Sequence, residues 1–451
     1  MLQIGLSSRM ALPQIGLDGY NLAMPHGTGV ATYGVTLAAT LRSMGANVTG
    51  LFGLPVAGDP DLREVLFYDL VQRPPSAQKR RRRWHHGLRE ALRPLAGFSL
   101  AEVPSSGHVE KGAFASRLPQ FDRLLSAGGL FEAAHAHFAA FGRFTTLRVA
   151  NPPEVMHWTY PVPIRLAGAR NIYTLHDLVP LRLPYTTLDD KKTYYSLVKR
   201  CAKQGDHIVT VSEASAADIV SRFGVPHDRI TNTYQASPPP TSIGASAEDA
   251  AMVEGIFGLR PGGYFLFFGA IEPKKNIGRL IEAYLTLRSE TPLVLVGARA
   301  WQSEEELRLL GGAGALSGGY GQRLGDRVVR LEYLPRQLLF RLIRCAKAVA
   351  FPSLYEGFGL PVHEAMLLGT PVLSSNVSSI PEVAGDGALL VDPYDTNAIA
   401  EGLKRLDEDA ALRESLRAAG PRHAQRFSID HYRARLQSLY ERVVSQPSRA
   451  A

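Results

Sequence analysis

The sequence predicts an α/β protein made of two Rossmann-like domains, each a doubly wound parallel sheet flanked by helices. Three observations support this prediction. The chain has 451 residues, which is long for one domain and fits two domains of about 200 residues each. Short apolar runs alternate with amphipathic helical stretches along most of the chain, as they do in βαβ units. A proline- and alanine-rich segment at residues 236–262 interrupts this alternation and predicts a linker.

The first half is expected to contain four strands and three helices. Apolar runs indicate the strands, and apolar residues three and four positions apart indicate the helices. Residues 55–130 are rich in proline, glycine and arginine and support no secure assignment. In chain order, the elements are a strand at residues 3–7, a helix at 30–44, strands at 48–52 and 170–175, a helix at 189–203, a strand at 207–212, and a helix capped by Ser212 that ends at residue 223.

The second half predicts a second doubly wound sheet, a fold in which ligands bind beyond the carboxyl ends of the strands. A glycine-rich stretch at residues 311–321 is expected to be a surface loop, because it fits no phosphate-binding pattern. The expected strands are residues 264–268, 292–296, 327–331, 346–351, 371–374 and 388–391, and the expected helices are 276–287, 337–344 and 397–406.

Composition favours a cytoplasmic protein. No apolar run approaches the ~20 residues that a membrane-spanning helix needs. The segment Met1–Leu6 lacks the basic start and the cleavage site of a signal peptide, and reads as a buried strand. Cys201 and Cys345 are the only two cysteines and have neither metal-ligand nor redox spacing, so a reducing compartment is expected.

A basic segment at Lys79–Arg93 stands out in a chain whose net charge is +8. Apolar residues at helical spacing, including Leu88 and Leu92, interleave its arginines. Such a stretch suits an anionic membrane surface, and it equally suits a solvated surface helix. Nucleic acid is not expected as a partner, because no nucleic-acid-binding module accompanies the charge.

The most informative motif lies between Glu356 and Glu364. A strand ends just before it, a loop with Gly357 and Gly359 follows, and a helix begins with Pro361 in its first turn. Backbone N–H groups of the loop and the positive end of the helix form an anion site suited to a diphosphate. Two carboxylates beside that site are suited to accept hydrogen bonds from sugar hydroxyls.

These residues resemble the E-x7-E motif of glycosyltransferase family 4. The resemblance is nearly continuous over residues 262–430 and looser in the first half. Segments of the second half that resemble the family are Phe267–Asn276, Leu293–Gly297 with Trp301, Tyr333–Pro335, Ile380–Val383 and Leu390–Pro393. Elsewhere the similar segments are Gly27–Gly29, Tyr173–Leu178, Val209–Glu213 and Phe427–Val444.

The resemblance implies the GT-B architecture, in which two Rossmann-like domains face each other across a deep interdomain cleft. Residues 1–235 would form the acceptor-side domain, and residues 263–427 the nucleotide-sugar-binding domain. Residues 236–262 would link them, and residues 428–451 would form a helix that crosses back to the first domain.

The resemblance also implies the roles of site residues. Glu356 would hold hydroxyls of the donor sugar, His176 would lie beside its anomeric carbon, and Lys275 would neutralise the diphosphate. Ala270 stands where many family members carry arginine, so either Lys274 or Arg279 would share this charge or donor affinity would be lower. The implied donor-binding residues are Gly27, Gly29, Lys275, Gly297, Leu334, Gly357, Phe358, Gly359, Leu360 and Glu364, the last at the ribose.

By the same resemblance, the function is retaining transfer of a hexose in surface polysaccharide biosynthesis. The expected donor is GDP-mannose, and the expected acceptor is a glycan or lipid-linked oligosaccharide. No metal or other cofactor is expected, because the Asp59–Asp61 and Asp407–Asp409 pairs lack the context of a metal–diphosphate site. A UDP-sugar-dependent transferase, a sugar-nucleotide epimerase and a non-catalytic nucleotide-sugar binder remain as alternatives.

Overall fold

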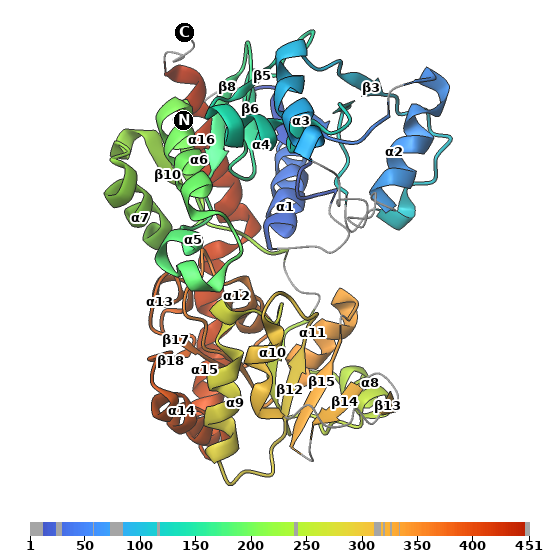
Figure 1. Ribbon diagram of the computed structural model, residues 1–451. Coiled ribbons are helices and arrows are strands. Elements are labelled where there is room, and N and C mark those ends of the chain that lie inside the picture. Colours follow the sequence, from blue (N-terminus) through green and yellow to red (C-terminus); the bar gives the residue numbers. More distant parts are fainter. Residues whose placement is uncertain are drawn as a thin grey trace, which may run out of the picture.

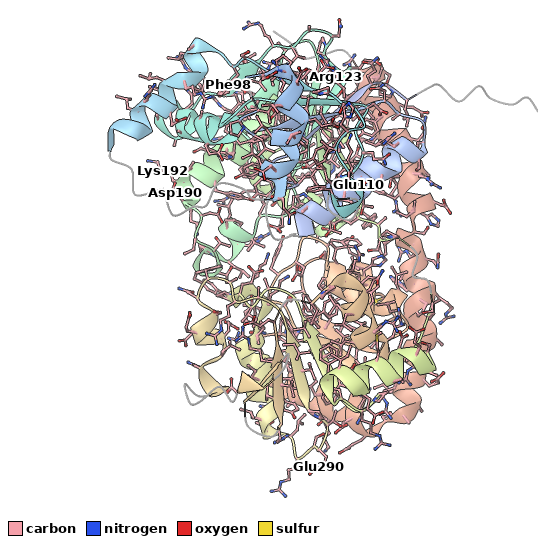
Figure 2. All side chains as sticks on the ribbon, turned by 90° about the vertical axis from the view of Figure 1, so that its right-hand side faces the viewer. Phe98, Glu110, Arg123, Asp190, Lys192 and Glu290 are labelled. Carbon is pink, nitrogen blue, oxygen red and sulfur yellow. The ribbon has the colours of Figure 1, made fainter. Side chains whose placement is uncertain are left out.

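The computed structural model describes residues 12–23, 29–56, 58–72, 84–114, 118–238, 242–310, 317–318, 321–324, 327–332 and 334–446. They form two lobes, one above the other in Figure 1, and the last helix lies along the upper lobe. Each lobe contains one large sheet with helices on its faces. Figure 2 shows side chains filling both lobes, with Phe98 and Arg123 in the upper lobe and Glu290 at the lower tip of the other. The predicted α/β class with two Rossmann-like domains is confirmed.

The first lobe contains an eight-stranded sheet in the order β10-β9-β8-β6-β1-β2-β4-β3. Its strands pair in parallel except for β3, which runs antiparallel to β4. The strands are β1 Ile15–Asp18, β2 Val48–Phe52, β3 Ala101–Val103, β4 Arg123–Ser126, β6 Val155–Trp158, β8 Arg170–Thr174, β9 His207–Thr210 and β10 Ile230–Asn232, and a separate pair is β5 Thr145–Leu147 with β7 Ile164–Leu166. The helices are α1 Gly29–Ser43, α2 Arg63–Gln72, α3 Trp84–Ala96, α4 Leu130–Phe141, α5 Val179–Arg182, α6 Lys191–Gln204 and α7 Glu213–Phe223.

The central strand of this sheet, β1, lies at a place that the sequence did not indicate. The strand expected at residues 3–7 lies outside the described residues, and Ile15–Asp18 pairs instead with both β2 and β6. This strand has four residues and includes a glycine, so its apolar pattern is weak although all four residues are buried. The expected strands at 48–52, 170–175 and 207–212 and the three expected helices are confirmed. Residues 55–130 contain α2, α3, β3 and β4 in place of irregular structure.

The second lobe contains a sheet in the order β13-β14-β15-β12-β11-β16-β17-β18. All six expected strands are present and parallel, and the glycine-rich stretch expected as a loop includes β13 and borders β14, a hairpin that extends the sheet. The strands are β11 Phe265–Phe268, β12 Leu293–Val296, β13 Ser317–Gly318, β14 Gly321–Leu324, β15 Val328–Leu331, β16 Ala348–Phe351, β17 Val372–Ser375 and β18 Leu389–Val391. The helices are α8 Ala247–Phe257, α9 Ile277–Thr286, α10 Ser303–Glu306, α11 Arg336–Cys345, α12 Leu360–Leu367, α13 Ile380–Ala384, α14 Thr396–Glu408 and α15 Ala410–Ala424.

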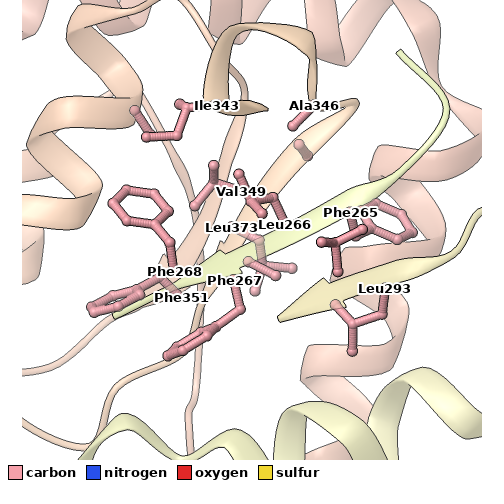
Figure 3. Close-up of a cluster of buried hydrophobic side chains, with 14 of the residues drawn as sticks. Phe265, Leu266, Phe267, Phe268, Leu293, Ile343, Ala346, Val349, Phe351 and Leu373 are labelled. Carbon is pink, nitrogen blue, oxygen red and sulfur yellow. The ribbon is translucent and has the colours of Figure 1, made fainter. Parts of the chain in front are cut away.

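The core of the second lobe centres on β11, whose four residues are Phe-Leu-Phe-Phe and are all buried. The rings of Phe267 and Phe351 stack with centroids 5.6 Å apart, which joins β11 to β16 (Figure 3). The chain leaves β11 toward β12 and β15, and then returns to β16 on the other side. This reversal of strand order opens a crevice between β11 and β16, where doubly wound sheets bind ligands.

The last helix, α16 Ile429–Ser445, packs on the first lobe. Tyr440 bonds through its hydroxyl to Nδ1 of His157 on β6 at 2.7 Å, and Leu436 is buried in the same core as Ile15 and Leu17. The exact domain limits stay a prediction. Among the described residues, no helix combines the length and apolarity needed to span a bilayer. Cys201 and Cys345 are buried free thiols.

The buried His157 predicts acid sensitivity. Burial, followed by the charges of His176 and His207, lowers its pKa to about 3. Its ordinary pKa is about 6.5, so the stabilising difference is fully present above pH 6.5 and is lost as pH falls toward 3, because only the unfolded chain takes up the proton. Between pH 6 and 4, the free energy of unfolding of a His157→Gln variant should therefore change less steeply with pH than that of the wild type, by up to about 1.4 kcal/mol per pH unit. Urea unfolding at several pH values measures this, with exposed His108→Gln as the control; identical slopes for wild type and His157→Gln would contradict the prediction.

Candidate active site

The loop between β16 and α12 forms the centre of the candidate site. Phe351 ends β16, and α12 begins at Leu360 with Pro361 in its first turn, as the sequence predicted. Gly359 caps the helix with φ 96°, and a Cβ there would lie 2.5 Å from the side chain of Ile380. Glycine is therefore required at 359 on both conformational and steric grounds. The first N–H groups of α12 are left available to bind an anion.

Glu356 is a buried, ionised carboxylate. Its Oε1 lies 2.6 Å from Nζ of Lys275, and both side chains are about one-tenth exposed. Burial alone would raise the pKa of Glu356, but the charges of Lys275 and Lys274 and the hydrogen bond from Lys275 hold it below its usual value. Backbone atoms of Glu356 bond to the hydroxyls of Ser378 and Ser379, which fix the loop. A carboxylate held in this way accepts hydrogen bonds from sugar hydroxyls without needing to reorient.

Asn276 connects the loops that carry these charges. It follows the 3₁₀ turn Pro273–Lys275 in a left-handed conformation, with φ 61°. Its side-chain amide donates to the carbonyls of Pro352 at 3.0 Å and Pro393 at 2.7 Å. The loops after β11, β16 and β18 are therefore joined by one buried side chain. Lys275 and Glu356 owe their positions to this connection.

Lys274 has a place of its own in the site. Its Nζ lies 3.6 Å from Glu272, and burial, which would lower its pKa, is outweighed by Glu272, Glu356 and Asp177, which raise it. It is therefore charged and faces the first lobe. Arg279, the other cation considered from the sequence, instead bonds to Asn276 and lies over the ring of Tyr394. Of the two candidates to share the charge of Lys275, the structure places Lys274 beside the cleft.

His176 lies just beyond the carboxyl end of β8, as expected. Its Nε2 donates to the carbonyl of Thr159 at 2.8 Å, which leaves Nδ1 as an acceptor, and its ring packs edge-on against Tyr33 with centroids 4.9 Å apart. Burial lowers the pKa of His176, although the Thr159 carbonyl and Asp177 oppose the shift. The neutral imidazole is suited to accept a hydrogen bond from a hydroxyl.

The two lobes touch directly behind this site. A Cβ on Gly357 would lie 2.7 Å from the backbone oxygen of His176 and 3.3 Å from Cβ of Asp177, so no other residue fits at 357. The hydroxyl of Ser215 bonds to the oxygen of His176 at 2.8 Å and contacts that of Gly357 at 3.4 Å. The predicted residues Glu356, Lys275, Gly357 and His176 therefore come together at one contact between the lobes.

Glu364 lies on α12 with a different cation. Its Oε1 is 3.0 Å from the guanidinium of Arg336, and burial raises the pKa of Glu364 while Arg336 opposes this shift. Arg336 was missed in the sequence because it is the first residue of α11, directly after the segment that resembles the family. The two glutamates of the motif are thus held by separate cations.

The other predicted donor residues surround these two glutamates. Gly29 begins α1, and a Cβ there would lie 3.8 Å from Leu360, so the amino ends of α1 and α12 face each other. Gly297 touches the backbone of Gly269 so closely that a Cβ would lie 1.8 Å from its oxygen. Leu334 is buried after β15, and Phe358 is buried against Phe427, so Phe358 offers a ligand only its backbone. Gly27 lies outside the described residues.

Comparison with known proteins identifies the family. A model described as "Glycosyl transferases group 1" matches residues 261–423, and one described as "Glycosyltransferase Family 4" matches residues 128–234. The O-antigen chain mannosyltransferase B of Escherichia coli is 34% identical over 275 residues, which are 60% of this chain and 69% of that protein. The chain belongs to glycosyltransferase family 4. The serotype-specific mannosyltransferase WbdA of Escherichia coli is 30% identical over 278 residues, which are 60% of this chain but only 33% of WbdA.

Solved structures confirm the predicted GT-B fold for this family 4 glycosyltransferase. Sucrose-phosphate synthase from Thermosynechococcus elongatus superposes with a TM-score of 0.64 at 18% identity, covering 95% of this chain and 98% of that one. HepE from Anabaena, in complex with UDP and glucose, gives 0.61 at 15% identity, covering 95% and 99%. The family models and the mannosyltransferase relatives, on this fold, show that the chain is a nucleotide-sugar-dependent glycosyltransferase, as the sequence predicted.

A pair of hydrogen bonds between the lobes leads to a testable prediction. Glu382 of α13 accepts from the backbone N–H groups of Glu213 and Ala214 at 3.0 and 2.9 Å, at the amino end of α7 in the other lobe. Removing the Glu382 carboxylate should make the free energy of lobe association less favourable by about 1–2 kcal/mol. The ratio of closed to open protein should then fall by a factor of roughly 5–30. A Glu382→Ala variant should show a larger radius of gyration by X-ray scattering and a raised KM for donor. The control is Glu401→Ala on α14; an unchanged radius and KM in Glu382→Ala would contradict this role.

Proposed function

We propose that this protein is a retaining mannosyltransferase that transfers mannose from GDP-mannose to a glycan or lipid-linked oligosaccharide in surface polysaccharide assembly. One observation carries the catalytic part: the Glu356–Lys275 pair and neutral His176 meet where the amino ends of α1 and α12 face each other. The mannosyl part is supported by the relatives, which are mannosyltransferases by name.

In this proposal, the diphosphate of the donor lies between the two helix amino ends. Partial positive charge there and the ammonium groups of Lys275 and Lys274 stabilise the negative charge that grows as the bond from the anomeric carbon to the phosphate oxygen breaks. Glu356 accepts hydrogen bonds from hydroxyls of the donor sugar, and Nδ1 of His176 accepts another. The acceptor hydroxyl attacks from the face that the diphosphate leaves, and its proton passes to the departing phosphate oxygen. The anomeric configuration is thereby retained.

We propose that the reaction needs no metal, since lysines and helix ends can supply the positive charge. The two aspartate pairs considered from the sequence have structural contacts. Asp59 accepts from the N–H of Asp61, Asp407 pairs with Lys347 at 2.5 Å, and Asp409 caps α15. Within the described ranges, no group of three or more histidine, cysteine, aspartate or glutamate side chains is arranged to hold a metal ion.

Nucleotide titration tests the donor site. Calorimetry in chelator should show selective micromolar binding of GDP over UDP, ADP and TDP. A Glu364→Ala variant should bind at least about tenfold more weakly, a loss of about 1.4 kcal/mol, because it lacks the carboxylate that accepts from ribose hydroxyls. Glu401→Ala is the matched control. Selective UDP binding would favour the UDP-sugar alternative, while a folded protein that binds no nucleotide would overturn the proposal, and binding without turnover would leave a non-catalytic binder.

We also propose that α3 attaches the protein peripherally to the inner face of the cell membrane. Leu88, Leu92 and Leu95 are 60%, 42% and 70% exposed and share one face of this helix, and Ala91 at the edge of that face is buried. Arg93, assigned to the basic patch from the sequence, bonds to the carbonyl of Gly128 at 2.6 Å and so serves the fold. Residues 79–83 lie outside the described part of the chain. An exposed leucine face beside basic residues suits the boundary between headgroups and acyl chains.

Replacing these three leucines by serine should abolish sedimentation with anionic phosphatidylglycerol vesicles, because the apolar face then has nothing to insert. Donor turnover should be unchanged, since α3 lies outside the candidate active site. The control is Leu285→Ser, which changes a 42% exposed leucine on the second lobe. Full vesicle binding by the triple variant would reject α3 as the attachment surface.

A further inference from the structure

A cavity of about 500 Å³ adjoins His176 on the side of the first lobe. Neither Glu356 nor Glu364 lines it, and most of its wall comes from the lobe that does not carry the E-x7-E motif. The lining residues are Val30, Tyr160, Pro161, His176, Asp177, Val179, Pro180, Thr187, Leu188, Asp189 and Tyr194 from the first lobe, with Glu272, Lys274 and Trp301 from the second. A volume of this size lies within the range of ligand pockets.

The charges around this cavity are mostly negative. Asp177, Asp189 and Glu272 contribute three carboxylates, whereas among the described residues of the lining Lys274 is the one lysine or arginine and lies 3.6 Å from Glu272. Lys274 is therefore already paired with a carboxylate, and in the proposed function its charge also faces the donor diphosphate. A phosphate or carboxylate on a ligand would meet the two further negative charges of Asp177 and Asp189, which is unfavourable in a partly desolvated site.

The uncharged part of the wall suits a sugar ring. Tyr160, Tyr194 and Trp301 supply aromatic surface, and the Tyr194 hydroxyl is turned to the backbone oxygen of Asp177 at 3.0 Å. One oxygen of Asp177 accepts from the N–H of Val179, which fixes that carboxylate in place. A fixed carboxylate that accepts from hydroxyls, beside aromatic faces that cover C–H groups, makes a site for a neutral polyhydroxylated ring.

Resting on the proposed transferase activity, we infer that this cavity binds the terminal sugar of the acceptor. It accepts neutral sugars and rejects phosphorylated ones, and Asp189 is a residue that determines this specificity. In the proposed function, α12, Glu364 and Arg336 of the second lobe bind the nucleotide and diphosphate, and neither Glu364 nor Arg336 lines the cavity, most of whose wall belongs to the first lobe. The acceptor hydroxyl then reaches the anomeric carbon beside His176.

Charge reversal at Asp189 tests this inference. Its side chain is exposed, and Lys191 donates to its backbone oxygen and not to its carboxylate, so Asp189→Lys should fold normally. Ligand-observed NMR with GDP present, using methyl α-mannoside and mannose 6-phosphate as probes, should show that wild type binds only the neutral glycoside. Asp189→Lys should bind mannose 6-phosphate at least tenfold more tightly than wild type and the neutral glycoside more weakly.

The control is Asp228→Lys, which makes the same change at an exposed position of the same lobe outside the cavity and should behave as wild type. Three outcomes would each overturn the inference: the wild type binds mannose 6-phosphate, it binds neither probe, or Asp189→Lys changes only the KM for donor. Nucleotide titration of the wild type separates this outcome from failure of the proposed function, because acceptor specificity and nucleotide binding are read independently.

Discussion

The buried ion pair between Lys275 and Glu356 is the interaction on which the candidate site depends. Each charge has lost most of its hydration, so removing one partner would leave the other uncompensated at a cost of about 3–5 kcal/mol. Asn276, which connects the loops after β11, β16 and β18, helps to hold the two partners in position. A donor that brings phosphate oxygens to the lysine and hydroxyls to the glutamate would meet groups that are already dehydrated and oriented, which lowers the reorganisation needed on binding.

Much of the second lobe could be predicted from the sequence, because its strands are continuous apolar runs and its motif follows a strand directly. The run Phe265–Phe268 is readable as a fully buried strand without any tertiary information. The secondary structure of the first lobe was harder to predict from the sequence. Its central strand Ile15–Asp18 is too short to show a period. Local patterns cannot reveal elements whose stability comes from their neighbours.

The sequence could name the site residues but not their partners. That Glu356 pairs with Lys275 while Glu364 pairs with Arg336 depends on how three loops are arranged in space. The need for glycine at 357 likewise comes from the backbone of His176, a residue 181 positions earlier in the chain that belongs to the other lobe. Spacing along the chain carries no information about such contacts, so a motif gives the chemistry of a site and the fold gives its electrostatics.

The return of α16 to the first lobe means that the chain passes between the lobes twice. The two passages lie side by side, since the rings of Tyr234 and Phe427 have centroids 5.0 Å apart, and Phe358 of the donor loop packs on Phe427 at 5.3 Å. Two adjacent covalent connections favour rotation of the lobes about an axis near both connections over twisting or sliding of one lobe on the other. We therefore expect opening of the protein to be a rotation of the lobes about this region, against which the donor loop packs through Phe358.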